Sequence, residues 1–268
     1  MRILFFFTTL FCFILSVVDA QDTILKNPVI TSHRGAASLA PENTLAAVQK
    51  ALDMGVSRIE IDIRQTKDSV LVLMHDKKLK RTTGQKGKLK NLEFSETFGL
   101  NASSGFKSVY ASQQIPTLSE VIKLVNGKSK LILDLKISGK VFEKKLLKLI
   151  DSCHAQSWCI IASMKDRPLK RIRKLDRSIE LHKSFVGKIP FIPVYVAIGL
   201  FTRRLKKYDY VSEFNFKYNF ISKHLVNKIH RLHKKVNAWT VDKQSKFIKV
   251  VSKNVDGIIT NNPNISKE

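Results

Sequence analysis

Two places in the chain set a histidine beside a charged residue, each directly after an apolar run. His33 and Arg34 follow the run that ends at Ser32, and His75 and Asp76 follow a second run. Imidazole gains and loses a proton near neutral pH, so two histidines brought together are suited to acid–base catalysis. One histidine in such a position is usually structural. Two of them, with an arginine and a carboxylate, predict a catalytic site.

Carboxylates at a regular spacing accompany these histidines. Glu60 and Asp62 are two residues apart in an apolar run, so in a β-strand their side chains share one face. Burying two carboxylates is costly unless a cation compensates them, which favours a metal ion over an exterior arrangement of ion pairs. Asp134 and Lys136 repeat the spacing at the end of a later apolar run. They predict a third oxygen ligand and a positive charge for a phosphate oxygen.

The elements that must position these residues are short apolar, β-branched runs that alternate with longer amphipathic stretches. This alternation is typical of a parallel sheet wrapped by helices in one α/β domain. In an eight-stranded barrel of this class, the active site lies at the carboxyl ends of the strands. The nine expected strands are Val29–Ser32, Ile59–Ile63, Val70–Met74, Leu131–Leu135, Cys159–Ala162, Ile179–His182, Val211–Phe216, Val236–Val241 and Gly257–Thr260.

Nine expected strands are one more than an eight-stranded barrel requires. The six residues between Ile59–Ile63 and Val70–Met74 are too few for a helical crossover, so a hairpin is expected there. A turn near Asp68-Ser69 would set Asp62 opposite His75, since the two residues are equally distant from that turn. A helix is expected over Asn43–Met54, which carries apolar residues at helical spacing and ends before a glycine.

Three further segments concern the organisation of the chain. Residues 1–20 read as a cleaved signal peptide, because the apolar run is shorter than the roughly 20 residues of a membrane anchor, which is the alternative. Residues 21–268 are expected to form one domain, exported and located at the cell surface, in the periplasm or outside the cell. The polar, glycine-broken segment 77–114 predicts an insertion, and the apolar stretch 189–201 is expected to be a buried loop or a lipid contact.

The chain is strongly basic, with a formal charge of +25 from 47 Lys and Arg against 22 Asp and Glu. An exported protein ordinarily meets no nucleic acid, so the field indicates peripheral contact with an anionic membrane or a polyanionic wall polymer. Solvated helix faces or a lysine-rich coding bias would give the same count.

Nine strings of the chain form an ordered set. They are His33-Arg34-Gly35, Pro41-Glu42-Asn43-Thr44, Glu60-x-Asp62, Thr66-Lys67-Asp68, His75-Asp76, Arg81-Thr82-Thr83-Gly84, Asp134-x-Lys136, Ala238-Trp239-Thr240-Val241-Asp242 and Val255-Asp256-Gly257-Ile258-Ile259-Thr260-Asn261-Asn262-Pro263. In this order they resemble the glycerophosphodiester phosphodiesterase family, over essentially the whole chain after residue 20. No single string is decisive, but so many in one order are a specific signal.

The resemblance implies a triosephosphate-isomerase-type (β/α)8 barrel with a small insertion after the His75-Asp76 strand. It also implies one divalent cation, Ca²⁺ or Mg²⁺, as the cofactor. The implied site residues are Glu60, Asp62 and Asp134 as metal ligands, His33 and His75 as the acid–base pair, Arg34 and Lys136 as phosphate contacts, and Trp239 as an apolar wall for glycerol.

At several positions the sequence allows more than one interpretation of the residue's role. Glu42 either reaches into the site, where it orients His33 or a substrate hydroxyl, or stabilises the following helix through its dipole. Asp134 stands where the family usually has glutamate, which alters ion preference or requires a bridging water. Asp242 stands where asparagine is common, and Asn261 where aspartate is common; Asn261 is expected to be structural. The sequence does not decide which histidine donates the proton. It also leaves open whether water or the glycerol 2-hydroxyl attacks first.

The expected function is hydrolysis of glycerophosphodiesters to sn-glycerol 3-phosphate and an alcohol, outside the cytoplasm, on deacylated phospholipids or glycerophosphate polymers. One alternative is an activity like that of lysophospholipase D or sphingomyelinase D; the Pro41–Thr44 string and Trp239 favour the first interpretation. A second alternative is a non-catalytic surface protein that binds anionic lipid or wall polymer through its basic face.

Overall fold

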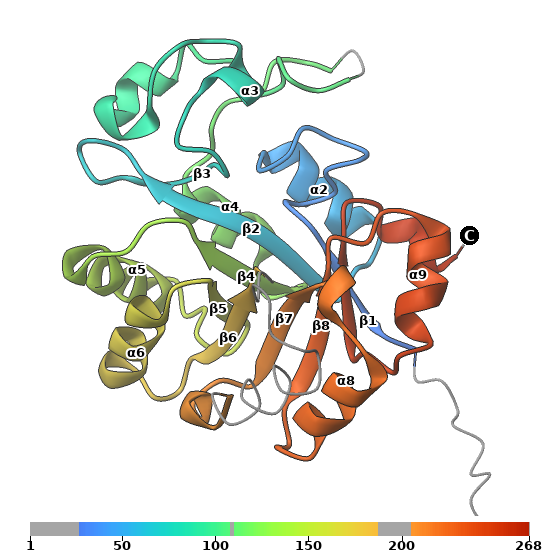
Figure 1. Ribbon diagram of the computed structural model, residues 1–268. Helices are drawn as coiled ribbons and strands as arrows, with labels where there is room; N and C mark the ends of the chain where they lie inside the picture. Colours follow the sequence, from blue (N-terminus) through green and yellow to red (C-terminus); the bar gives the residue numbers. More distant parts are fainter. Residues whose placement is uncertain (1–26, 108–109, 187–204, 268) are drawn as a thin grey trace, which may run out of the picture.

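Eight parallel strands close into a barrel in the computed structural model, which describes residues 27–107, 110–186 and 205–267 (Figure 1). The strands are β1 Val29–Ser32, β2 Arg58–Gln65, β4 Lys130–Leu135, β5 Cys159–Ser163, β6 Glu180–Phe185, β7 Glu213–Lys217, β8 Lys235–Trp239 and β9 Gly257–Thr260. Each pairs with the next, and β1 pairs with both β9 and β2, which closes the cylinder. The expected barrel is confirmed.

The ninth strand, β3 (Leu71–Leu73), lies outside the barrel and runs antiparallel to β2, as the short connection predicts. Its register differs by one residue from the expected one. Ile63 pairs with Leu73, and the amide of Met74 donates a hydrogen bond to the carbonyl of Asp62 at 3.0 Å. Met74 therefore lies opposite Asp62, and the expectation that His75 does so is wrong.

The turn of this hairpin explains the difference. The amide of Thr66 donates to the carbonyl of Val70 at 3.1 Å, and Ser69 adopts the left-handed conformation with φ of 68°. The loop is thus centred on Asp68 itself. His75 lies beyond the end of β3, where its carbonyl accepts hydrogen bonds from Nε and Nη2 of Arg64 at 3.0 and 2.6 Å.

Helices surround the barrel (Figure 1). The helix after β1 begins at Leu45 rather than at Asn43, because Asn43 has a φ of 57° and cannot belong to a right-handed helix. Thr44 caps it by accepting a hydrogen bond from the amide of Ala47 at 3.2 Å. The helices are α2 Leu45–Asp53, α3 Lys80–Thr83, α4 Leu118–Val125, α5 Lys140–Ser152, α6 Asp166–Leu175, α8 Lys223–His230 and α9 Gln244–Val251.

The alternation of β2 shows how the sequence separates core from site. Ile59, Ile61 and Ile63 are fully buried in the apolar layer between the strands and the helices. Glu60 and Asp62 alternate with them and therefore point to the barrel interior. One strand thus contributes to the core with one face and to a polar site with the other.

Residues 77–107 and 110–114 form a folded segment that shares a small apolar cluster with β3. It contains α3 and the 3-10 helices η1 (Leu89–Asn91) and η2 (Phe94–Thr97). Buried apolar side chains of this segment pack against Val72 on β3 and against Met74, which follows β3. The whole cluster comprises Val72, Met74, Leu79, Leu89, Ala102 and Ile115. The segment projects from the barrel beside β3 (Figure 1).

Buried polar side chains fill the barrel at the amino ends of its strands. Arg58 donates from both terminal nitrogens to the two carboxylate oxygens of Glu213, at 2.8 and 2.9 Å. Asn237 donates to Glu213 at 2.7 Å, and Nε2 of the fully buried His182 lies 3.6 Å from the same oxygen. This ionic cluster lies at the end of the barrel opposite the carboxyl ends.

The expected signal peptide (residues 1–20) and the apolar stretch 189–201 lie outside the described residues. Among the residues that are described, none of the helices is long and apolar enough to cross a membrane. Cys153 and Cys159 are free thiols, and Cys159 is buried.

Candidate active site

A pocket opens at the carboxyl ends of the barrel strands, and the structure brings most of the expected site residues to it. Its charged and aromatic lining includes His33 and Arg34 after β1, Glu60 on β2, Asp134 and Lys136 at the end of β4, and Trp239 at the end of β8. His75 reaches it from the connection after β3. The remaining wall is mostly apolar or small: Ile132, Ala162, Met164, Ser184, Asn215, Thr240 and Ile259.

Glu60, Asp62 and Asp134 form a carboxylate cluster in which one oxygen of each lies within 4.8 Å of the others. Their exposed fractions are 5, 0 and 8 %. Burial and the charges of Asp62 and Asp134 raise the pKa of Glu60 well above its usual value, and burial also raises the pKa of Asp134. Three buried carboxylates repel one another unless positive charge is supplied.

The donor set fits a divalent cation. Oδ1 of Asp134 is buried and accepts no hydrogen bond from the residues that the structure describes. Carboxylate oxygens are the ligands that Ca²⁺ and Mg²⁺ prefer, and a buried carboxylate oxygen without a hydrogen-bond partner is available as such a ligand. Asp134 reaches the cluster although its side chain is shorter than the expected glutamate.

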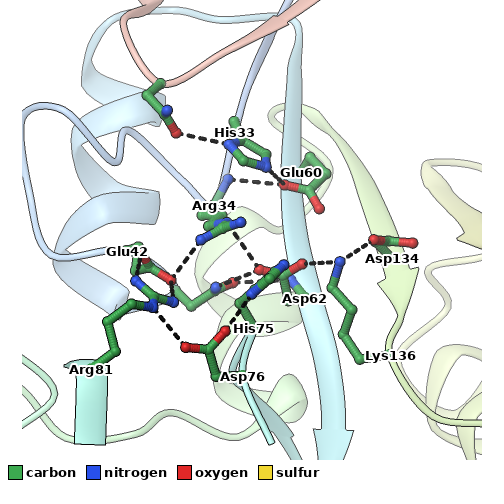
Figure 2. A network of polar contacts seen from close by, with 12 residues as sticks. His33, Arg34, Glu42, Glu60, Asp62, His75, Asp76, Arg81, Asp134 and Lys136 are labelled. Atoms are coloured by element: carbon green, nitrogen blue, oxygen red, sulfur yellow. Dashed lines mark hydrogen bonds and ion pairs between the residues drawn. The ribbon is translucent and has the colours of Figure 1, made fainter. Parts of the chain in front are cut away.

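Lys136 supplies part of the compensating charge. Its Nζ lies 2.8 Å from Oδ1 of Asp62 and also hydrogen-bonds Asp134 (Figure 2). Burial alone would lower the pKa of Lys136, but Asp134, Asp62 and Glu60 outweigh burial and raise it. For Asp62, burial is likewise outweighed by Lys136 and Arg34, so its pKa is lowered. The site therefore holds at least one fixed cation beside its carboxylates.

The turn after β1 aims the backbone at the same cluster. Arg34 and Gly35 have φ of 53° and 80°, and the amide of Arg34 donates to Oε2 of Glu60 at 3.0 Å. A Cβ on Gly35 would lie 2.6 Å from the Cβ of Ala47, so only glycine fits between this turn and α2. Nε of Arg34 lies 3.3 Å from Oδ2 of Asp62.

Asn43 holds Asp62 in place through two reciprocal hydrogen bonds. Nδ2 of Asn43 donates to Oδ2 of Asp62 at 2.7 Å, and the amide of Asp62 donates to Oδ1 of Asn43 at 2.9 Å. Asn43 is 4 % exposed and adopts the left-handed conformation that asparagine tolerates. Sequence reasoning did not identify this role, although the Pro41–Thr44 string contains the residue.

Glu42 is held by two arginines, Arg34 and Arg81. Its Oε1 accepts from Nη1 of Arg34 at 3.0 Å, and both of its oxygens accept from Arg81, at 2.6 and 2.8 Å. It lines a second, adjoining pocket that also includes His75. Glu42 therefore reaches the edge of the site, but among the described residues its hydrogen bonds are with Arg34 and Arg81 and not with His33. Arg81 was not expected to take part.

The two histidines are held by different partners. Nδ1 of His75 lies 2.7 Å from Oδ1 of Asp76, whose other oxygen accepts from Nε of Arg81 at 2.6 Å (Figure 2). Nδ1 of His33 lies 2.7 Å from Oδ1 of Asn261, and its Nε2 lies 3.8 Å from Oε2 of Glu60. Burial, with the charge of Arg34, lowers the pKa of His33 to about 4. The imidazole of His33 is therefore uncharged near neutral pH.

A second group of potential metal ligands lies at the opposite end of the barrel. Oxygen and nitrogen atoms of Glu180, His182 and Glu213 also lie within 4.8 Å of one another. Both oxygens of Glu213 are already occupied by Arg58, so a guanidinium stands where a metal ion would be needed. This cluster is a structural ion network.

Comparisons with known proteins agree with this geometry. The model of the glycerophosphoryl diester phosphodiesterase family matches residues 33–265. A glycerophosphodiester phosphodiesterase of Caldanaerobacter subterraneus subsp. tengcongensis is 32% identical over 241 residues, which cover 88% of this chain and 94% of that protein. A putative glycerophosphodiester phosphodiesterase of Bacillus subtilis is 30% identical over 242 residues, covering 87% and 94%.

Solved structures show the same fold. A phosphodiesterase of Oleispira antarctica, determined in complex with the product sn-glycerol-3-phosphate, superposes with a TM-score of 0.76 at 26% identity and covers 90% of this chain and 96% of that one. A putative glycerophosphodiester phosphodiesterase of Galdieria sulphuraria has a TM-score of 0.77 at 22% identity, with 90% and 97% covered. The chain therefore belongs to the glycerophosphoryl diester phosphodiesterase family of phosphoric diester hydrolases.

Proposed function

We propose that this chain hydrolyses glycerophosphodiesters to sn-glycerol 3-phosphate and an alcohol, in a reaction that depends on a divalent cation. The observation that supports the proposal best is the cluster of three buried carboxylates within 4.8 Å, faced by two histidines in one pocket. The product bound to the Oleispira antarctica relative is the glycerol phosphate that this reaction releases.

Glu60, Asp62 and Asp134 would hold the cation, Ca²⁺ or Mg²⁺, which supplies positive charge to the phosphate oxygens as negative charge builds in the transition state. Arg34 and Lys136 contribute fixed positive charge from two other sides of the same pocket. Both side chains are largely buried, at 18 and 14 % exposure, so their charges act through little water.

The partners of the histidines suit them to opposite proton transfers. His33, with its pKa lowered to about 4 and an amide oxygen at Nδ1, is unprotonated at neutral pH and accepts the proton of the attacking hydroxyl. His75 has the carboxylate of Asp76 at Nδ1, a partner that fixes the orientation of the ring, and it delivers a proton to the leaving alcohol.

The glycerol part would pack against Trp239, and Ile132 and Ala162 line the same pocket. This lining is small, which favours a short polar alcohol. The activity of a lysophospholipase D or sphingomyelinase D is the second candidate, and a longer apolar surface at the pocket mouth would be needed to seat its acyl chain.

The cellular setting is also part of the proposal. An apolar segment over residues 1–20 and the net charge of +25 support export and contact with an anionic lipid or wall polymer, whose glycerophosphate units would then be substrates. Binding of the purified protein to anionic vesicles at low and at high salt measures this contact. Loss of binding at high salt is expected.

A substrate panel tests the proposed activity. Glycerophosphocholine, glycerophosphoethanolamine, a glycerophosphate oligomer and lysophosphatidylcholine are incubated with the enzyme, with Ca²⁺ or Mg²⁺ or with chelator, and glycerol 3-phosphate is measured. We expect release from the deacylated diesters, loss of activity with chelator, and loss of turnover in His33→Ala and His75→Ala. Asn227→Ala, an exposed change on α8, is the matched control.

Each alternative function predicts a different result. Preference for lysophosphatidylcholine would replace the proposal with the lysophospholipase D activity. Failure to cleave any diester, combined with binding to anionic polymer, would identify a non-catalytic surface protein.

A further inference from the structure

Two residues outside the expected set form a hydrogen-bond chain that ends on His33. Asn261 lies directly after β9, and Asp242 lies after β8, so the pairing of these two strands brings their ends together. Oδ1 of Asn261 lies 2.7 Å from Nδ1 of His33. Nδ2 of Asn261 donates to Oδ2 of Asp242 at 2.8 Å, and the backbone amide of Asn261 donates to Oδ1 of Asp242 at 2.8 Å.

The chemistry of the groups fixes the direction of each bond. A carboxylate only accepts hydrogen bonds, so the amide nitrogen of Asn261 must face Asp242. Oδ1 of Asn261 must then face His33, and it can pair with Nδ1 only if Nδ1 carries the hydrogen. Neutral imidazole carries one hydrogen, so Nε2 of His33 is left as the acceptor. Nε2 points to the carboxylate cluster, 3.8 Å from Oε2 of Glu60.

Asp242 is held by more than one contact. Oδ1 of Asp242 also lies 3.2 Å from the hydroxyl of Thr260, in addition to the amide of Asn261. With both oxygens engaged, the carboxylate cannot rotate without breaking bonds to two residues of the β9 end. The orientation of the Asn261 amide is thus set by a fixed partner.

We infer that Asp242 and Asn261 are positioning residues that select the tautomer of His33 with its hydrogen on Nδ1. The inference rests on the proposed role of His33 as the proton acceptor. Asp242 orients the amide of Asn261, and Asn261 accepts the Nδ1 hydrogen and so keeps Nε2 free for the proton of the attacking hydroxyl. Neither residue lines the pocket that holds the substrate.

These are the two positions at which the family resemblance implies the opposite pair of residues, asparagine at 242 and aspartate at 261. Because the two side chains are in contact, the exchange keeps one carboxylate and one amide in the chain of hydrogen bonds. Asn261, expected from the sequence to be structural, has a direct contact with the candidate catalytic histidine.

The exchange predicts how single and double variants behave. In Asp242→Asn, the Asn261 amide loses its fixed acceptor and is free to present its nitrogen to His33, which favours the wrong tautomer. In Asn261→Asp, two carboxylates meet at the 2.8 Å contact and repel each other. The double variant Asp242→Asn/Asn261→Asp exchanges the two groups. The amide introduced at position 242 donates to the carboxylate introduced at position 261, and this carboxylate accepts from Nδ1 of His33, so the chain is restored.

The test combines kinetics with the spectrum of His33. Steady-state hydrolysis of glycerophosphocholine is measured with the divalent cation present, for both single variants, the double variant and the exposed control Asp209→Asn. Loss of an orienting partner typically lowers activity roughly 10- to 100-fold. We expect kcat to fall by this amount in each single variant with little change in KM, and to recover in the double variant. Thermal unfolding checks that every variant is folded.

Nitrogen-15 spectra of histidine-labelled protein give a readout that does not depend on activity. The His33 signals are identified by their loss in the spectrum of His33→Ala, whose folding is checked by thermal unfolding. We expect wild type and the double variant to show a protonated Nδ1, and Asp242→Asn to show a mixture of tautomers.

The two proposals fail in different ways. If wild type shows a protonated Nε2, or if the double variant is no more active than the single variants, the positioning inference is overturned. If His33→Ala keeps full activity while the spectra show the expected tautomer, the fault lies in the role proposed for His33 and not in the hydrogen-bond chain.

Discussion

Replacing a buried glutamate by glutamine should have opposite effects at the two ends of this barrel. Glu60 and Glu213 are 5 and 1 % exposed, and both point to the barrel interior. Glu60 has two carboxylates for neighbours, whereas Glu213 has a guanidinium and an amide. Glu60→Gln should therefore stabilise the metal-free protein, and Glu213→Gln should destabilise it.

The distances give the size of each effect. The carboxylate oxygens of the cluster lie within 4.8 Å of one another, and two unit charges at that limit repel by about 3.5 kcal/mol at an effective dielectric constant of about 20. Glu60 has two such neighbours, and Lys136 offsets about one of them, which leaves a destabilisation of up to about 3 kcal/mol by the same relation. Breaking a buried ion pair, as in Glu213→Gln, typically costs about 3–5 kcal/mol.

The assay is thermal unfolding followed by circular dichroism, on chelated protein at neutral pH. A change of about 3 kcal/mol corresponds to a shift in Tm of about 6–12 °C for a domain of this size, upward for Glu60→Gln and downward for Glu213→Gln. Adding Ca²⁺ or Mg²⁺ at about 100 times Kd should stabilise wild type and Glu213→Gln by about 2.7 kcal/mol. Glu60→Gln should gain much less, because it has lost a ligand.

The same measurements can refute the reasoning. Equal destabilisation by both substitutions would mean that lost hydrogen bonds, and not the sign of the neighbouring charges, govern these positions. Full stabilisation of Glu60→Gln by the cation would remove Glu60 from the ligand set. Asp209→Asn, an exposed carboxylate on the outer surface, controls for the loss of a negative charge and should change stability by no more than about 0.5 kcal/mol.

Three further predictions follow from the contacts of the site and of the barrel interior. Burial alone would raise the pKa of Glu213, but its neighbours outweigh burial and lower it from 4.5 to about 2. Ionised Glu213 therefore stabilises the fold above about pH 4.5, and up to about 3 kcal/mol of this stabilisation is lost as the pH falls toward 2. In urea titrations, the difference in unfolding free energy between wild type and Glu213→Gln should narrow over that range. Asn43→Ala removes both bonds to Asp62 and should weaken cation affinity by roughly 10- to 100-fold in calorimetric titration; unchanged affinity would show that Asp62 needs no support. Arg81→Ala frees Asp76 from its guanidinium partner and should lower kcat, with partial retention in Arg81→Lys; a change confined to KM would count against a role in orienting the acid–base group.

Local patterns were sufficient for the architecture. Alternation of isoleucine with charged residues in β2 already separates a core face from a site face, because strand side chains point alternately to opposite sides. The short link between β2 and β3 excluded a parallel pairing, so the ninth strand was recognised as half of a hairpin. The register of that hairpin could not be read in this way, since it depends on the hydrogen bond between Thr66 and Val70 within the turn.

The sequence alone predicted which residue types would carry the chemistry, namely two histidines, three carboxylates, an arginine and a lysine at strand ends. Only the tertiary structure decided how each is held. The contacts that hold them join residues 5 to 228 positions apart in the chain: Asn43 with Asp62, Arg81 with Asp76, and Asn261 with both His33 and Asp242. Such contacts leave no periodic signal in the sequence, because the tertiary fold, and not a regular spacing along the chain, brings the hydrogen-bond partners together.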